Sequence, residues 1–135
     1  MKKSMVIILL VAMAAGFVFG GEAVAPEQNS DGYYLIETWQ NLYWIGQDAA
    51  RLSLAYQQMA DIDLAEADPP VSEWNSGLGW QPFGIFTGHY DGNGHVIKNL
   101  YINSTAGYPA LIFRLAGRLY NLGVVDADIT AGTYA

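Results

Sequence analysis

Three groups of acidic and histidine residues have types and spacings that could support chemistry. Asp61 and Asp63 lie two positions apart, which puts both carboxylates on one side of a strand, and paired carboxylates hydrolyse glycosidic bonds. The run Asp91-Gly-Asn-Gly94 resembles part of a calcium-binding loop. His89 and His95 are the only histidines, and imidazole is a common zinc ligand.

Each of these groups has a structural explanation that we favour. An EF-hand needs ligands at five or more set positions and a late bidentate Glu, but the twelfth position of a loop that begins at Asp91 is Ile102. The two histidines lack helical i, i+4 spacing, and the chain has no cysteine. It also lacks His-Glu-x-x-His and Gly-x-Ser-x-Gly. We therefore expect a tight glycine turn, solvent-facing strand aspartates, and no catalytic residue, metal site or cofactor; the chain is not expected to be an enzyme.

The four tryptophans could form a platform on which sugar rings stack. Trp74 lies in a polar segment and is the best candidate for an exposed, ligand-stacking side chain. Trp39 and Trp80 are better explained by packing in the core or in a cap. Trp74 is thus the only ligand-contacting residue that we predict.

The start of the chain has the features of an export signal. Lys2 and Lys3 precede a continuous apolar run over residues 5–19, which is too short for a membrane-spanning helix. Ala23-Val-Ala25 has the small-x-small form of a cleavage site, with Gly20 as an earlier alternative. Residues 1–25 are therefore expected to be a signal peptide cleaved between 20 and 25, and an uncleaved anchor is the alternative. The chain is predicted to be secreted or displayed on a bacterial surface, and free of the membrane after cleavage.

The charge and composition restrict the rest of the chain to a single acidic domain. Beyond Ala25 four basic residues stand against 12 acidic ones, and such a surface repels phosphate backbones. Nucleic acid is therefore not an expected partner. The lack of cysteines means that disulfides do not stabilise this exported chain, which favours a long stacked core or one end of a larger protein.

The elements that would position these residues fall into two parts. Residues 26–32 are expected to be a linker, and residues 33–64 a cap with one short helix. Thr38 can cap a helix from about Trp39 to Ala50, because apolar residues then recur at helical spacing. An extended segment follows, with a bend between Tyr56 and Ile62. Residues 65–79 are expected to be a polar loop without regular structure.

From Trp80 onward every apolar run is short and bounded by Gly or Asn, which predicts strands joined by tight turns. The run Ile97-Lys-Asn-Leu-Tyr-Ile102 reappears further along the chain as Leu119-Tyr-Asn-Leu-Gly-Val124. A repeat of about 22 residues is typical of a parallel β-helix or of leucine-rich repeats. The Asn position of a leucine-rich repeat is occupied by Thr105 and Ala127, so we favour the β-helix.

In that interpretation matched residues stack on adjacent rungs. Ile97 would lie against Leu119, Leu100 against Leu122, and Ile102 against Val124. Asn99 and Asn121 would also align, either as a buried ladder or as exposed turn residues.

The ordered set of motifs resembles the GLUG-motif repeat proteins of bacterial surfaces. Tyr56 to Leu64 ends in Asp-Ile-Asp-Leu, as in the cap of that family, and Trp80 to Gly84 matches its Trp-x-Pro-Ile-Gly segment with Phe for Ile. Phe86 to Leu100 matches Phe-x-Gly-x-Phe-Asp-Gly-Asn-Gly-His-x-Ile-x-Asn-Leu, with Tyr90 in the second Phe position. Leu119 to Gly123 matches Ile-x-Asn-Leu-Gly.

Two departures mark this chain as a divergent example. The loop that usually separates the Trp-Pro segment from the Phe-Gly segment is nearly absent. Arg114 stands where the Gly-Leu-Phe-Gly stretch of the family has its last glycine. The family includes adhesin-like proteins and the stalks of some IgA-cleaving metallopeptidases.

These observations predict an all-β fold, a right-handed parallel β-helix with a small α-containing N-terminal cap. Residues 80–135 would be its first rungs, and the chain would be the N-terminal fragment of a longer protein. The resemblance implies a non-catalytic surface or adhesion module whose partners are cell-surface glycans or host and matrix proteins. The alternatives are a carbohydrate-binding module, the edge of a β-helical polysaccharide-degrading enzyme, or the non-catalytic stalk of a surface metallopeptidase.

Overall fold

The computed structural model describes residues 22–105 and 109–132, and these residues form mostly short strands with few helical turns. The predicted signal peptide falls almost wholly outside the described residues. The elements are β1 (Tyr34–Ile36), α2 (Trp39–Ile45), η1 (Ala49–Ser53), β2 (Ala55–Gln58), β3 (Ile62–Asp63), η2 (Leu64–Glu66), η3 (Val71–Glu73), α3 (Trp74–Gly77), β4 (Phe83–Phe86), β5 (His89–Asp91), β6 (Val96–Lys98), β7 (Tyr101–Ser104), β8 (Ile112–Leu115), β9 (Arg118–Tyr120), β10 (Gly123–Val125) and β11 (Asp128–Ala131).

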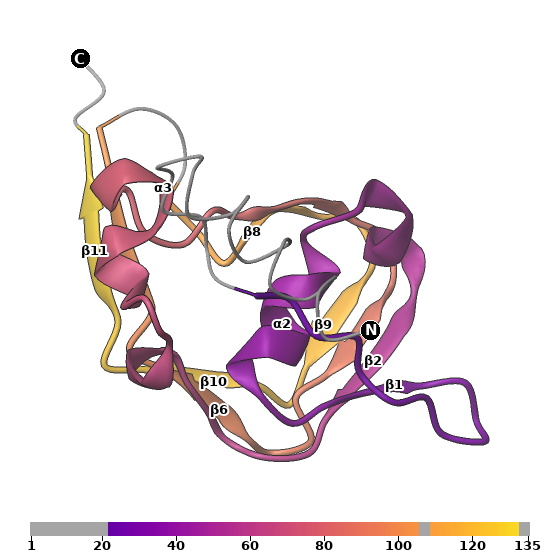
Figure 1. Ribbon diagram of the computed structural model, residues 1–135. Helices are drawn as coiled ribbons and strands as arrows, with labels where there is room; N and C mark the ends of the chain where they lie inside the picture. Colours follow the sequence, from indigo (N-terminus) through magenta and orange to yellow (C-terminus); the bar gives the residue numbers. More distant parts are fainter. Residues whose placement is uncertain (1–21, 106–108, 133–135) are drawn as a thin grey trace, which may run out of the picture.

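The strands form four small sheets in which every pair of named strands is parallel. The sheet orders are β1-β2-β5-β9, β10-β6-β3, β11-β7 and β4-β8. Neighbours in a sheet are never consecutive strands, except β1 and β2. From β5 to β9 the chain passes through all four sheets before it returns to the first (Figure 1). The expected all-β class is confirmed at this level.

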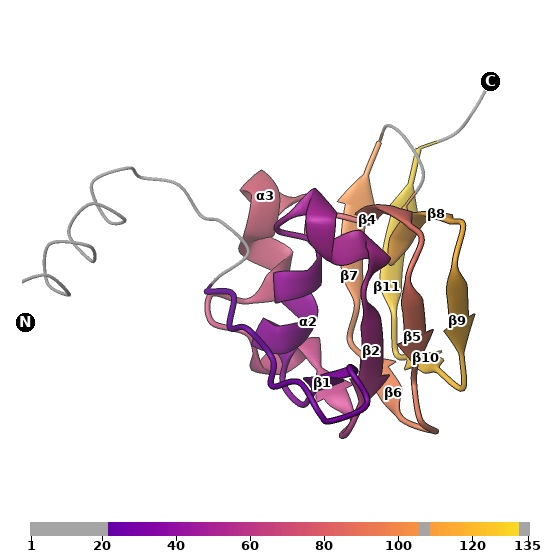
Figure 2. The same ribbon diagram turned by 90° about the vertical axis from the view of Figure 1, so that its right-hand side faces the viewer.

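The chain therefore stacks in three layers. Layer 1 is residues 49–73, in which η1 contacts β4, and η3 contacts β7. Layer 2 is β4 to β7, and layer 3 is β8 to β11. Phe83 of layer 2 pairs with Ile112 of layer 3, and Ile97 pairs with Val124, so one layer occupies roughly 27 to 29 residues, a length within the range of solenoid repeats. Figure 2 shows the layers side by side.

The predicted 22-residue register is wrong. Ile97 pairs with Val124, and Leu119 pairs with Tyr90. The repeated sequence marks two different corners, because Asn99 (φ 59°) lies between β6 and β7 whereas Asn121 (φ 54°) lies between β9 and β10. Asn tolerates this left-handed conformation better than most residues, so similar corners select similar sequences. Asn99 and Asn121 accordingly form no ladder.

The cap helix is shorter than expected. Thr38 accepts a hydrogen bond from the Asn41 N–H at 3.2 Å, which confirms it as the N-cap. The helix ends at Ile45, and not near Ala50, because Gly46 is its C-cap and Asp48 caps the separate turn η1. The Asp48 carboxylate accepts from the Ala50 N–H at 2.9 Å, so the chain turns toward layer 1 there.

The segment 65–79 is more ordered than predicted. It contains η2 in part, η3 and the single turn α3, in which Asn75 and Ser76 adopt positive φ. Short helical turns satisfy backbone groups locally even where proline excludes a longer helix. Val71 and Trp74 anchor the segment, since both are buried in the core.

The core runs along the stacking axis and is closed at one end by the cap. Leu42 and Ile45 of α2 are fully buried, and Figure 2 places α2 and α3 at the end of the stack opposite β9. Gln58 is a fully buried polar residue of this core. Its side-chain amide donates hydrogen bonds to Ala60 O at 2.9 Å and Val96 O at 3.0 Å. Its oxygen accepts from the Tyr90 hydroxyl at 2.7 Å, which joins layers 1 and 2.

Glycine is required at one corner of layers 2 and 3, above the layer 1 residue Leu54. A Cβ added to Gly88 would collide with the backbone of Leu54, and one added to Gly117 would collide with the backbone of Gly88 and Thr87. Gly88 and Gly117 thus lie one above the other, where successive layers approach too closely for any side chain.

Candidate functional site

The expected exposure of Trp74 is wrong, because this side chain is 1% exposed. Its indole N–H donates to Pro69 O at 2.8 Å. Its ring contacts Trp39, Tyr43 and Trp80 at centroid distances of 5.6, 5.1 and 6.2 Å. The polar residues around Trp74 in the sequence form the outer surface of the segment, while the ring packs between the cap and layer 2. Trp74 cannot stack on a ligand in this conformation.

The other tryptophans also serve packing. Trp80 is 2% exposed, and its N–H donates to Leu111 O at 3.2 Å, as the packing interpretation expects. Trp39 is partly buried against the core. The Arg51 guanidinium lies 3.9 Å from the Trp44 ring centroid, a cation–π contact.

Asp61 and His95 form an exposed contact between layers 1 and 2. His95 Nδ1 lies 3.3 Å from Asp61 Oδ1, which also accepts from the Val96 N–H at 3.1 Å. The hydrogen bond from Val96, and secondarily the contact with His95, lower the pKa of Asp61 from its ordinary value of 3.8. The carboxylate therefore stays ionised and connects two layers, the opposite of what a general acid needs.

Asp63 has a similar role. It accepts from Asn99 Nδ2 at 2.7 Å and from the Ala65 N–H at 2.9 Å, and these bonds lower its pKa. The two aspartates thus have separate hydrogen-bond partners, although both line one shallow groove of about 220 Å³ with Glu37 and Glu66.

The Asp91-Gly-Asn-Gly94 run forms the expected tight turn. Asp91 accepts from the Asn93 N–H at 2.8 Å, and the His95 N–H donates to Gly92 O at 2.8 Å. Asp91 also accepts from Asn121 Nδ2 at 3.4 Å in layer 3. Among residues 22–105 and 109–132, no group of three or more His, Cys, Asp or Glu side chains gathers as a metal site would require.

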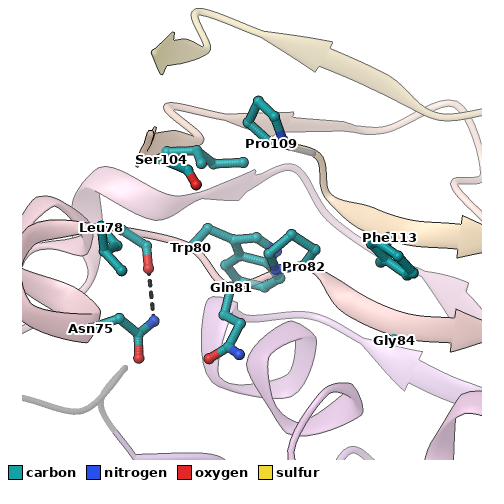
Figure 3. A pocket seen from close by; sticks show the side chains of 11 residues that line it. Asn75, Leu78, Trp80, Gln81, Pro82, Gly84, Ser104, Pro109 and Phe113 are labelled. Carbon is teal, nitrogen blue, oxygen red and sulfur yellow. Dashed lines mark hydrogen bonds between the residues drawn. The ribbon is translucent and has the colours of Figure 1, made fainter. Parts of the chain in front are cut away.

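A groove of about 430 Å³ lies beside the Trp-Pro segment (Figure 3), and a second hollow of about 590 Å³ adjoins it at Trp80 and Gln81. Pro109 and Ser104 lie along one side, and Asn75 and Gln81 along the other. Asn75 Nδ2 donates to Gly79 O at 2.8 Å, which fixes the turn that forms that side. The groove is lined by Asn75, Leu78, Gly79, Trp80, Gln81, Pro82, Gly84, Ile102, Ser104, Pro109 and Phe113.

The groove combines ring surfaces with uncharged polar groups. Phe113 is 55% exposed, and no Asp, Glu, Lys, Arg or His lines the groove among the described residues. Such a surface suits a neutral ligand that offers both C–H faces and hydroxyl groups.

Sequence reasoning missed Gln81 and Phe113. The alternation of β8 could have located Phe113, because Ile112 faces inward and the next residue of a strand faces outward.

Comparison with known proteins gives two similar sequences. Halomucin of Haloquadratum walsbyi is 35% identical over 117 residues, which cover 84% of this chain and 1% of halomucin. A protein of Evansella cellulosilytica, described by its name as a Gly-rich membrane protein, is 35% identical over 132 residues, which cover 89% of this chain and 14% of that protein. The chain thus spans a small fraction of both relatives. The name of the second relative describes a membrane protein.

No family model matches the chain, and no solved structure matches it. Within the described residues, no helix has the length and apolar character that a membrane crossing requires.

Proposed function

We propose that this chain is the N-terminal part of an exported, non-catalytic surface protein of the GLUG-motif type. Its architecture would be a right-handed parallel β-helix with an α-containing cap. The observation that carries the proposal is the in-register parallel stacking of Tyr56 on Tyr90 and of Tyr90 on Leu119, repeated on the other sides of the stack. The length and names of the two relatives support a large protein of the cell surface.

The motifs of the proposed family lie where this architecture would need them. The Asp-Ile-Asp-Leu stretch supplies the β3 strand and the interlayer bonds of Asp61 and Asp63. The Asp-Gly-Asn-Gly turn follows β5, and each Asn-Leu pair supplies a corner. A module built in this way presents an extended, chemically inert scaffold, which is what a surface or adhesion protein requires.

Cysteine crosslinking tests the architecture directly, since the natural sequence has no cysteine. Lys98 pairs with Val125, so the double variant Lys98→Cys/Val125→Cys should form a disulfide under mild oxidation. The matched pair Lys98→Cys/Tyr120→Cys, which follows the 22-residue offset, should remain reduced. Crosslinking of the second pair alone would contradict the stacking.

Export is tested by expressing the full chain with an epitope tag in a bacterium. The mass of the extracellular product should show cleavage between residues 20 and 25, and protease added to intact cells should remove the tag. Retention of the uncleaved chain in the cytoplasm would refute the surface location. Binding of the purified product to immobilised matrix proteins then tests adhesion.

Carbohydrate binding is a second candidate, favoured by the uncharged groove beside Phe113. A glycan array should show binding that Phe113→Ala and Gln81→Ala each weaken about tenfold or more. Tyr120→Ala is the control, because Tyr120 is an exposed aromatic residue outside the groove. Equal loss in all three variants, or no binding by the parent, would exclude the groove as a sugar site.

A further inference from the structure

Layer 3 exposes the open edges of four strands at one end of the molecule. Each of β8, β9, β10 and β11 pairs with one neighbour in layer 2, and each is the last strand of its sheet within the described residues. Figure 2 shows β9 and β10 at the end opposite α2. Open strand edges are templates for the addition of another strand.

The apolar columns of the core reach the surface at this end. Phe86 and its layer 3 partner Leu115 are 0% and 47% exposed, and Ile97 and its partner Val124 are 0% and 45% exposed. Ile129, which pairs with the buried Ile102, is 45% exposed. The end face of layer 3 therefore has the same apolar character as the face of layer 2 that layer 3 covers, but no further layer covers it.

The geometry restricts what can cover this face. A second copy cannot stack head to tail, because α2 closes the opposite end with the fully buried Leu42 and Ile45. Two copies could meet only through identical faces, and the twofold axis would then run the paired strands antiparallel. Every strand pair between layers here is parallel. A layer that continues in the same direction fits without any change of register.

We propose that the face formed by β8 to β11 is the docking surface for a fourth layer of parallel strands, supplied by polypeptide that follows Ala135. If the next layer has the length of the one between Ile97 and Val124, the partner of Ile112 would lie beyond Ala135. The fourth layer should place aliphatic side chains over Leu115, Val124 and Ile129, and a glycine over Gly117. This inference rests on the β-helix architecture proposed above, and not on any ligand.

The test is to add such a layer. A second copy of residues 109–135 is appended to the full chain, which reproduces the offset between β6 and β10. Amide hydrogen exchange in β8 to β11 should slow by at least about tenfold, and the melting temperature should rise by about 5 °C. In the control, the appended copy carries Lys at the positions that correspond to Val124 and Ile129, and both gains should disappear.

A substitution in layer 3 of the 135-residue chain distinguishes docking of the appended layer from a general effect on stability. Val124→Lys should change the melting temperature of the 135-residue chain by less than about 2 °C, because this side chain is already exposed. The same change should remove most of the stabilisation in the extended chain, since it would then bury a charge.

Two results would overturn the proposal. One is an appended layer that is digested as a free tail while the parent residues stay protected. The other is a parent chain that sediments as a dimer and becomes monomeric with Val124→Lys, which would make a second copy the occupant. If instead β5 to β7 of the parent chain show no exchange protection, the architecture itself is wrong.

Discussion

At the scale of single residues, the polar side chains that resemble a site serve to connect layers. Asp63 in layer 1 binds Asn99 in layer 2, and Asp91 in layer 2 binds Asn121 in layer 3. Gln58 and Tyr90 do the same inside the core. A hydrogen bond between layers needs side chains at fixed spacing just as catalysis does, which is why the two roles look alike in a sequence.

The buried Gln58 gives the sharpest test at this scale. Gln58→Leu should lower the free energy of unfolding by at least about 2 kcal/mol, because it leaves Ala60 O, Val96 O and the Tyr90 hydroxyl without their partner. Urea unfolding measures the change. Gln57→Leu, at the next and more exposed position of β2, is the control and should cost less than about 1 kcal/mol. Equal costs would contradict the role of the Gln58 network.

The lowered pKa of Asp63 predicts how the stability of the fold responds to acid. Its folded-state pKa lies below 3.8, so its stabilisation is present above that pH and is lost as the pH falls toward the folded value. Asp63→Asn should therefore be less stable than the parent at pH 7, and the difference should shrink by pH 3. Urea midpoints at the two pH values measure this. The control is Asp128→Asn, at an exposed position of β11. Its difference in stability from the parent should not shrink between pH 7 and pH 3.

At the scale of elements, corners decide how the strands are arranged. From Trp80 onward the sequence pattern indicates short strands joined by tight turns, and the structure contains them. The pattern misses the corners at Asn99 and Asn121, where positive φ divides each of the runs 96–102 and 119–125 into two strands. It gives the wrong partners, since Ile97-Lys-Asn-Leu100 and Leu119-Tyr-Asn-Leu122 are similar corners on different sides of the stack. Local sequence encodes the corner, whereas the register depends on the length of the whole layer.

The glycine corner can be tested by adding one methyl group. Gly88→Ala should destabilise the fold by about 3 kcal/mol or more, because the new Cβ would meet the backbone of Leu54, which cannot rotate away. Gly84→Ala is the control: its Cβ would lie 3.4 Å from the flexible side chain of Leu52 and should cost less than about 1 kcal/mol. Thermal or urea denaturation distinguishes the two, and similar costs would argue against the close approach at the corner.

At the scale of the whole molecule, the two ends differ. One end is covered by α2, and the other exposes β8 to β11. The burial of Trp74 shows why packing at this scale is hard to predict from the sequence. Its neighbours in sequence are polar, but α2 and the Trp80 segment enclose its ring from both sides. Burial there depends on contacts between distant segments, which no local pattern records.

The difference between the ends predicts a gradient of stability. Leu42→Ala at the covered end should cost about 2–5 kcal/mol, because it leaves a cavity in the core. Val124→Ala at the exposed end should cost less than about 1 kcal/mol. Native-state hydrogen exchange should likewise show the amides of β8 to β11 opening first. Uniform protection along the stack would contradict this gradient.

The parallel pairing between layers also has a mechanical consequence. Because the interlayer hydrogen bonds point along the stacking axis, a pull on the end of the molecule would load one layer's bonds before those of the next. The chain should yield layer by layer, and each step would release one layer, roughly 90 Å of extended polypeptide. A protein built by repeating such layers would absorb force by lengthening in steps while its cap stays folded.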